Sequence, residues 1–157
     1  MKTLEKLVVK DAYLSVDEKP AVVSLTDAFS QIIYDFAHHA ELRGIFVVDH
    51  KNRFVGVITR TDLLDWARVK LGAIFQKPLT NIDQTIRFAN LIQAESVSDV
   101  VRPETKEVAV FANDSLALAL RRMIESDSII LPVIDEAQHI IGNLTLSELL
   151  DRVLVEG

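Results

Sequence analysis

The sequence predicts an α/β fold made of two tandem β-α-β-β-α units, because one pattern of residues occurs twice in the chain. Residues 44–64, GIFVVDHKNRFVGVITRTDLL, match residues 130–150, ILPVIDEAQHIIGNLTLSELL. Matched residues are 86 positions apart throughout, as for Asp49 and Asp135 (135 − 49 = 86). A repeat in fixed register indicates two supersecondary units that bury their hydrophobic faces against each other.

Each copy of the repeated segment is expected to form a strand, a turn, a strand and a helix. The β-branched runs IFVVD and LPVID are too short for helices, and the polar runs HKNR and EAQH that follow them are typical of turns. FVGVIT and IIGNLT then predict return strands. Apolar residues at helical spacing in TDLLDWARV and LSELLDRVL predict the closing helices.

A strand and a helix are also expected before each repeated segment. Residues 21–25 and 108–111 predict the strands. Thr26 with Asp27, and Asn113 with Asp114, are expected to begin the helices, since such side chains accept hydrogen bonds from free backbone N–H groups; Thr26 is the predicted N-cap. The apolar faces of the two helices follow at helical spacing: Phe29, Ile32, Ile33 and Phe36, then Leu116, Leu120, Met123 and Ile124.

We expect three segments along the chain. Residues 1–75 form the first domain with an N-terminal lead-in, residues 76–96 a connecting helical segment, and residues 97–157 the second domain. Within the connection, residues 80–83 are typical of a helix start, and the apolar residues after them fit an amphipathic helix: Ile86, Leu91 and Ile92. The connection is not rich in Gly and Ser, so the two domains are not expected to be independent.

The bulk composition excludes several classes of protein. The chain of 157 residues is 49% hydrophobic and 25% charged, which is ordinary for a globular protein. A formal net charge of −6 argues against a nucleic-acid or anionic-membrane partner. Without cysteine, neither a disulfide nor a thiolate metal site can form. No apolar run approaches a membrane span of about 18 residues, and the charged start MKTLEKLVVKD is unlike a signal peptide, so a cytoplasmic location is expected.

The repeat resembles the CBS domain, named after cystathionine β-synthase, and two in tandem resemble a CBS pair, or Bateman module. The resemblance is carried by FVVDHKNRFVGVITRTDLL and PVIDEAQHIIGNLTLSELL, by VSDVV at residues 97–101, and more loosely by VVKDAYL at residues 8–14. It implies two units related by pseudo-twofold symmetry that associate as a homodimer. It further implies an adenosine-containing ligand in the clefts between the paired domains, such as AMP, ADP, ATP, S-adenosylmethionine or cyclic di-adenylate. Such modules regulate a separate protein and are not catalysts. The alternative is an interaction or dimerisation module without a ligand.

The candidate site lies where a predicted strand ends and a helix begins, at Thr59, Arg60, Thr61 and Asp62. Free N–H groups at a helix start favour an anion, the threonine hydroxyls can donate to a phosphate, and Arg60 can supply charge if it points inward. An ionised Asp62 can accept both hydroxyls of a ribose. The resemblance implies that role for Asp62 and places the adenine between the first strand and the start of the second, at Val22, Val23, Gly44, Ile45 and Phe46.

A capping box explains the same residues without a ligand. Thr-x-x-Asp and Thr-x-x-Glu at a helix start place an acidic side chain where it bonds back to the N–H of the cap. Both interpretations stay open for Asp62, whereas the longer Glu148 suits the capping box better. The second copy also has Ile129 and Ile130 where the family usually has a basic residue. A second site is therefore expected to be degenerate, at Thr145, Ser147, Glu148 and Pro132.

Other groups of residues predict less. A metal site could be drawn with Asp35, His38 and His39, but adjacent histidines point to different sides of a helix, so no metal is expected. Arg121 and Arg122 are interpreted as a solvated face. Two aromatic residues either cover an interface or pack in the core: Trp66 and Phe75. The sequence contains no nucleophile–base pair, glycine-rich phosphate loop or catalytic carboxylate pair, so an enzyme is not expected.

Overall fold

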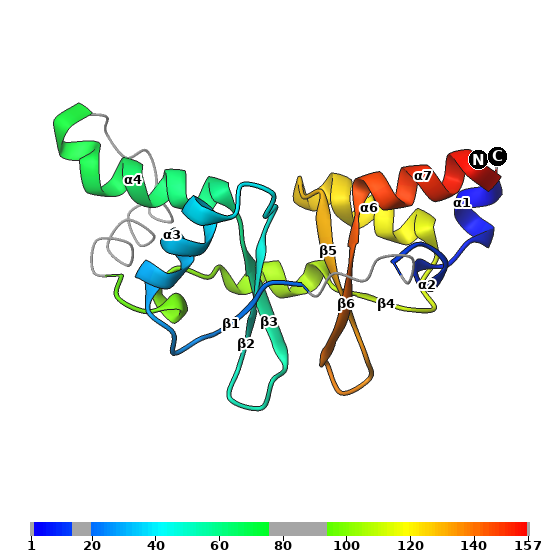
Figure 1. The fold of residues 1–157 in the computed structure, drawn as a ribbon, viewed down its shortest axis with the longest axis horizontal. Helices are drawn as coiled ribbons and strands as arrows, with labels where there is room; N and C mark the ends of the chain where they lie inside the picture. Colours follow the sequence, from blue (N-terminus) through cyan, green and yellow to red (C-terminus); the bar gives the residue numbers. More distant parts are fainter. Residues whose placement is uncertain (1, 14–19, 76–93, 157) are drawn as a thin grey trace.

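The computed structural model describes residues 2–13, 20–75 and 94–156, in which the chain forms two α/β units side by side (Figure 1). The helix predicted within residues 80–92 lies outside these described residues. Within the described ranges, no helix combines the length and the apolar character needed to cross a bilayer.

The first unit has the predicted β-α-β-β-α order. Its elements are β1 (Val22–Ser24), α3 (Phe29–His38), β2 (Ile45–Val48), β3 (Phe54–Ile58) and α4 (Arg60–Phe75). β2 is the central strand, parallel to β1 and antiparallel to β3, with Val47 opposite both Val23 and Gly56. The parallel pair needs a crossover connection, which α3 provides.

The second unit repeats the first. Its elements are β4 (Val110–Phe111), α6 (Leu116–Ser126), β5 (Ile130–Ile134), β6 (Ile140–Thr145) and α7 (Leu146–Glu156). Val133 in the central strand lies opposite Val110 and Gly142, which is the register of the first sheet shifted along the chain. The predicted tandem repeat is therefore confirmed.

The segment before each copy packs on the other copy. η1 (Val97–Asp99), a 3₁₀ helix, buries Val97 in the core of the first unit together with Val100. The N-terminal helices α1 (Lys2–Lys6) and α2 (Val9–Tyr13) instead contribute to the core of the second unit, with Leu4, Val9, Ala12 and Tyr13. The domain boundaries expected from the sequence stay a prediction. In space, the segment before the first copy packs in the second unit, and the segment before the second copy packs in the first unit.

Backbone hydrogen bonds fix this exchange. At the start of α3, the N–H of Phe29 donates to the carbonyl of Glu95 at 2.9 Å. At the start of α6, the N–H of Leu116 donates in the same way to the carbonyl of Leu7 at 2.9 Å. Each lead-in thus accepts a helix-terminal N–H that has no acceptor within its own helix.

The glycine in each return strand makes room for a lead-in. A Cβ atom on Gly142 would lie 2.7 Å from the ring of Tyr13. A Cβ atom on Gly56 would clash with Val101 and would lie 2.7 Å from Oγ1 of Thr105. A glycine in the middle of a strand commonly marks such a close approach, and here it explains why both copies have one.

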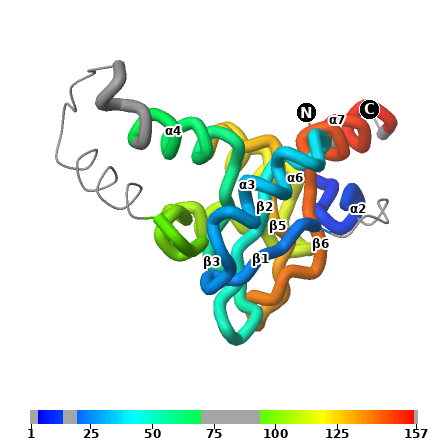
Figure 2. Tube along the Cα trace, turned by 60° about the vertical axis from the view of Figure 1, so that its left-hand side comes forward, coloured from blue at the N-terminus to red at the C-terminus, as the bar shows by residue number. Residues whose placement is uncertain are grey.

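The two sheets meet through a third apolar cluster, formed by Phe46, Phe54, Val57, Ile130 and Ile134. The Phe46 and Phe54 rings pack edge to face, with centroids 6.1 Å apart. The N–H of Phe54 also donates to the carbonyl of Gln138 at 2.8 Å, which joins the two hairpins directly. In both backbone views the hairpin turns lie at one end of the sheets, and α4 and α7 lie at the other (Figures 1 and 2).

The predicted turns between the hairpin strands are present, and in each one a residue has positive φ: Asn52 (61°) and Gln138 (70°). In the first turn, the Asp49 carboxylate accepts hydrogen bonds from the N–H groups of Arg53 at 3.0 Å and Lys51 at 2.8 Å. These bonds, with the Arg53 guanidinium, lower the pKa of Asp49 from 3.8 to about 2.

The predicted helix starts were wrong by one or two residues. The N-cap of α3 is Ala28, which provides no side-chain acceptor, and the N-cap of α6 is Ser115, whose hydroxyl accepts from the Leu118 N–H at 3.1 Å. Asp27 and Asp114 instead accept from the N–H groups three residues earlier, at 2.8 Å and 2.7 Å. Their carboxylates therefore close the strand-to-helix turns and do not cap the helices.

Candidate functional site

Asp62 lies in the first turn of α4, directly after β3, and is 1% exposed. Its Oδ2 accepts a hydrogen bond from the Thr59 N–H at 2.8 Å, and the Thr59 hydroxyl approaches the same oxygen at 3.4 Å. This is the carboxylate half of a capping box. The Asp62 N–H donates to the backbone carbonyl of Thr59 at 3.0 Å.

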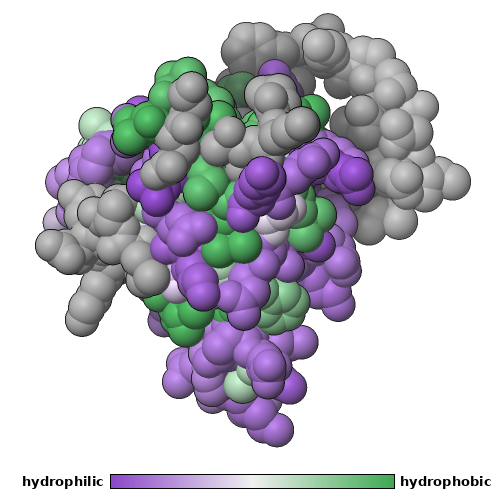
Figure 3. All heavy atoms as spheres, turned by 90° about the vertical axis from the view of Figure 1, so that its right-hand side faces the viewer, coloured by the Kyte–Doolittle hydropathy of each residue, from purple (hydrophilic) through white to green (hydrophobic). Residues whose placement is uncertain are grey.

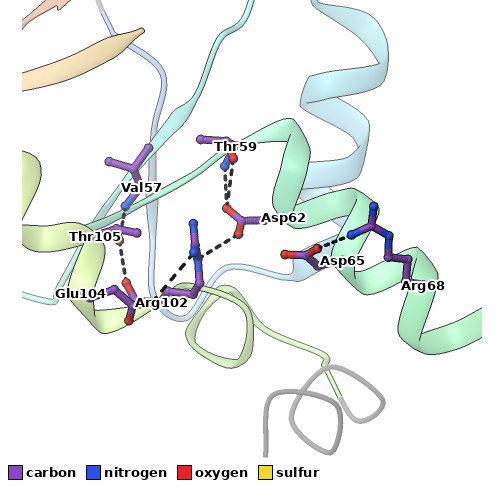
Figure 4. Close-up of polar contacts among 8 residues, drawn as sticks. All are labelled: Val57, Thr59, Asp62, Asp65, Arg68, Arg102, Glu104 and Thr105. Atoms are coloured by element: carbon purple, nitrogen blue, oxygen red, sulfur yellow. Dashed lines mark hydrogen bonds and ion pairs between the residues drawn. The ribbon is translucent and has the colours of Figure 1, made fainter. Parts of the chain in front are cut away.

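The second oxygen of Asp62 faces a cation from another part of the chain (Figure 4). Nε of Arg102 lies 3.2 Å from Oδ1, and the Arg102 side chain is 42% exposed. The contact is an ion pair whose alignment falls short of a hydrogen bond. Arg102 directly precedes η2 (Pro103–Val108), a second 3₁₀ helix. Arg102 was not among the residues predicted for the site; its one local signal is that it follows VSDVV.

Arg60, the cation expected at the site, is bound elsewhere. Its guanidinium donates to the carbonyls of Phe36 at 3.0 Å, His39 at 2.9 Å and Leu42 at 3.2 Å. It also lies over the Phe36 ring, 4.8 Å from the centroid. Arg60 therefore stabilises the C-terminal end of α3, where a cation opposes the helix dipole. Thr61 is exposed on α4.

The residues expected around an adenine do not form one exposed surface. Val23 and Ile45 are part of the first core, and Phe46 is part of the cluster between the sheets. Gly44 is buried where the units meet, and a Cβ atom there would lie 3.3 Å from both Ile130 and Val57. Val22, in contrast, is 44% exposed at the start of β1.

In the second unit, Glu148 makes a complete capping box. Its Oε1 accepts from the Thr145 N–H at 2.9 Å and from the Thr145 hydroxyl at 2.8 Å, while its own N–H donates to that hydroxyl at 3.2 Å. Pro132 is buried in β5. Ser147 and Glu148 also line a pocket of about 380 Å³ between α2 and α7, with Asp11, Ala12, Asp151, Arg152 and Val155.

Comparisons with known proteins identify the architecture. The family model described as "CBS domain" matches residues 9–68 and 97–155, which together are most of the chain. The chain belongs to the CBS-domain family. No curated protein matches it.

Solved structures share the fold of this CBS pair. A CBS domain-containing protein from Thermotoga maritima is 25% identical with a TM-score of 0.72, and the match covers 96% of each chain. CBSX2, solved in complex with AMP, is 20% identical with a TM-score of 0.72, over 95% of this chain and 97% of the other. A CBS domain pair solved with 5′-methylthioadenosine and S-adenosyl-L-methionine is 15% identical with a TM-score of 0.62, over 96% and 97% of the two chains.

The remaining predicted residues have structural contacts in the CBS pair. Arg122 is not part of a solvated face, because its Nη1 donates to the carbonyls of Glu107 at 2.5 Å and Ala109 at 2.9 Å; Arg121 is exposed. Trp66 packs on Phe29 in the first core, with ring centroids 5.5 Å apart. The Phe75 side chain lies outside the described residues.

The two histidines at the end of α3 contact carbonyls of that helix. Nδ1 of His38 lies 2.9 Å from the Tyr34 carbonyl, and Nδ1 of His39 lies 3.1 Å from the Asp35 carbonyl. Within residues 2–13, 20–75 and 94–156, no three His, Asp or Glu side chains are grouped so that they could hold a metal ion.

Proposed function

We propose that this CBS pair is a regulatory module that binds an adenosine-containing ligand, such as AMP, ADP, ATP or S-adenosylmethionine, at the first site. Binding of the ligand at this site regulates a separate partner protein, and the module itself is not a catalyst. We place it in the cytoplasm. No nucleic acid and no membrane is among its proposed partners, consistent with a net charge of −6.

The observation that carries this proposal is the difference between Asp62 and Glu148. Glu148 makes all three bonds to Thr145 that a capping role needs. Asp62 bonds through one oxygen to the Thr59 N–H, and its second oxygen faces the Arg102 guanidinium. A helix cap uses one carboxylate oxygen. The contact between the second oxygen of buried Asp62 and a half-exposed cation is therefore not explained by capping. The ligands of the AMP and S-adenosylmethionine complexes of the same fold are the chemical class that we propose.

A ligand-free interaction module is the second candidate, and the site geometry gives it specific support. Asp62 has Thr59 and Arg102 as partners, and the three donor nitrogens of Arg60 are engaged, so both charged groups are paired without a ligand.

We propose a homodimer under either candidate. Leu64 on α4 and Leu150 on α7 are 51% and 43% exposed at matching positions of the repeat, and Leu154 is 78% exposed. In the view onto the second unit, hydrophobic residues lie among hydrophilic ones in the upper and middle parts, whereas the lowest part is mostly hydrophilic (Figure 3). Exposed apolar helix faces of this kind fit a second copy better than they fit water.

A thermal-shift panel separates the two candidates. A ligand that binds only the folded state at 100 times its Kd adds about 2.7 kcal/mol of stability, which is roughly 5–10 °C in Tm for a chain of this size. We expect a shift of that order with at least one of AMP, ADP, ATP and S-adenosylmethionine, and none with GMP as the matched control. An unchanged Tm with every adenosine compound at millimolar concentration would favour the ligand-free module.

A further inference from the structure

We infer that Arg102 is an internal counter-ion that closes the first site, so that a ligand must displace it from Asp62. The inference rests on the proposed function and adds a mechanism of regulation to it. It also assigns a role to a residue outside the helix start on which the site was predicted.

The Asp62 carboxylate is buried. A ribose hydroxyl has to approach a carboxylate oxygen to within about 3 Å to bond to it, yet the Asp62 side chain is only 2% exposed. Some covering group must therefore move before a ligand can reach this carboxylate. Among the described residues, Arg102 is the cation in contact with Asp62 (Figure 4), and its side chain is 42% exposed to solvent.

Arg102 belongs to a segment that is hydrogen-bonded to both units. The Arg102 carbonyl accepts a hydrogen bond from the Thr105 hydroxyl at 2.6 Å, and that hydroxyl accepts from the Val57 N–H in β3 at 2.9 Å. Farther along the same segment, the Glu107 and Ala109 carbonyls accept hydrogen bonds from Arg122 on α6. Displacing Arg102 thus acts on a segment that is bonded to both units, which gives the site a route for signalling.

The repeat supports a role for Arg102 at one site only. The segments that precede the two copies align with an offset of 88. Val8 forms a β-bridge with Ser115 in the second unit, and Ser96 forms the matching β-bridge with Ala28 in the first (96 − 8 = 88). In this alignment the sequence position that corresponds to Arg102 is Leu14 (102 − 14 = 88), which carries no charge.

The test is the affinity for adenosine, which has no phosphate that Arg102 could bind. Arg102→Leu in the full chain removes the competitor and introduces the residue of the other lead-in. Adenosine should then bind roughly tenfold more tightly, a change that corresponds to about 1.4 kcal/mol. Arg121→Leu, the same substitution at an exposed arginine, is the matched control and should leave the affinity unchanged.

Two outcomes overturn different parts of the account. If the parent binds adenosine and Arg102→Leu binds it equally or more weakly, the counter-ion role is wrong and the proposed function stands. If neither protein binds adenosine or any adenosine nucleotide, both fall.

If Arg102→Leu does not fold, NMR of the parent decides. The Nε–Hε resonance of Arg102 is identified by its loss in Arg102→Lys. It should shift when adenosine is added, and an unmoved resonance at saturation would overturn the inference.

Discussion

Residues 1–75, produced alone, are expected to lack a stable monomeric fold. This fragment loses Val97 and Val100 from the first core and keeps an N-terminal lead-in whose apolar residues pack in the absent second unit. Burial of each valine contributes about 1.5–3 kcal/mol, so the loss of two approaches the whole stability of a small domain, about 5–15 kcal/mol. Urea denaturation followed by circular dichroism, with sedimentation to establish mass, measures the outcome.

Residues 20–108 are the matched control for that fragment, because they keep the first unit together with Val97 and Val100, which pack in its core. We expect this piece to unfold more cooperatively than residues 1–75. A monomeric fragment 1–75 with a cooperative transition at least as stable as that of the control would contradict the exchanged lead-ins.

The repeat and most of its elements could be predicted because their signals are local. Alternating and helical spacings of apolar residues place the strands and helices, and a fixed offset relates the copies. The exchange of the lead-ins is not local. Nothing in the residues of η1 says that Val97 enters the core of the unit that precedes it in sequence.

The site was predicted in part for the same reason. Thr59 and Asp62 are three residues apart, so their contact follows from the helix start. Arg102 lies 40 positions from Asp62 (102 − 62 = 40) and reaches it only in the folded chain. Arg60 is near in sequence, but its guanidinium extends to the end of α3. Sequence spacing cannot distinguish these two arginines, because the direction of a side chain depends on tertiary contacts.

Asp62→Asn is expected to lower the affinity for the adenosine ligand on the order of 10- to 100-fold. Asparagine keeps an acceptor for the Thr59 N–H but loses the charged double acceptor, and hydrogen bonds to a charged group are worth roughly 1.5–3 kcal/mol. We also expect a loss of at most about 1 kcal/mol in the free energy of unfolding, because the ion pair that Arg102 loses is screened by solvent on the arginine side, which is 42% exposed. Titration calorimetry and urea denaturation measure the two effects.

Glu148→Gln is the matched control for this substitution, since glutamine keeps an acceptor for the Thr145 N–H in the second unit. It should change the ligand affinity by less than about twofold, within the scatter expected for a site that is not contacted. An Asp62→Asn protein that binds its best adenosine ligand as tightly as the parent would remove Asp62 from the site.

The number of ligands bound per chain tests the central claim most directly. Isothermal titration calorimetry of the full chain with AMP, ATP and S-adenosylmethionine should give saturation at one site per chain with at least one of them, because Asp62 and Glu148 differ in their contacts. Two sites of equal affinity would contradict the asymmetry between the units, and the absence of binding to every one of these ligands would contradict the proposed function itself.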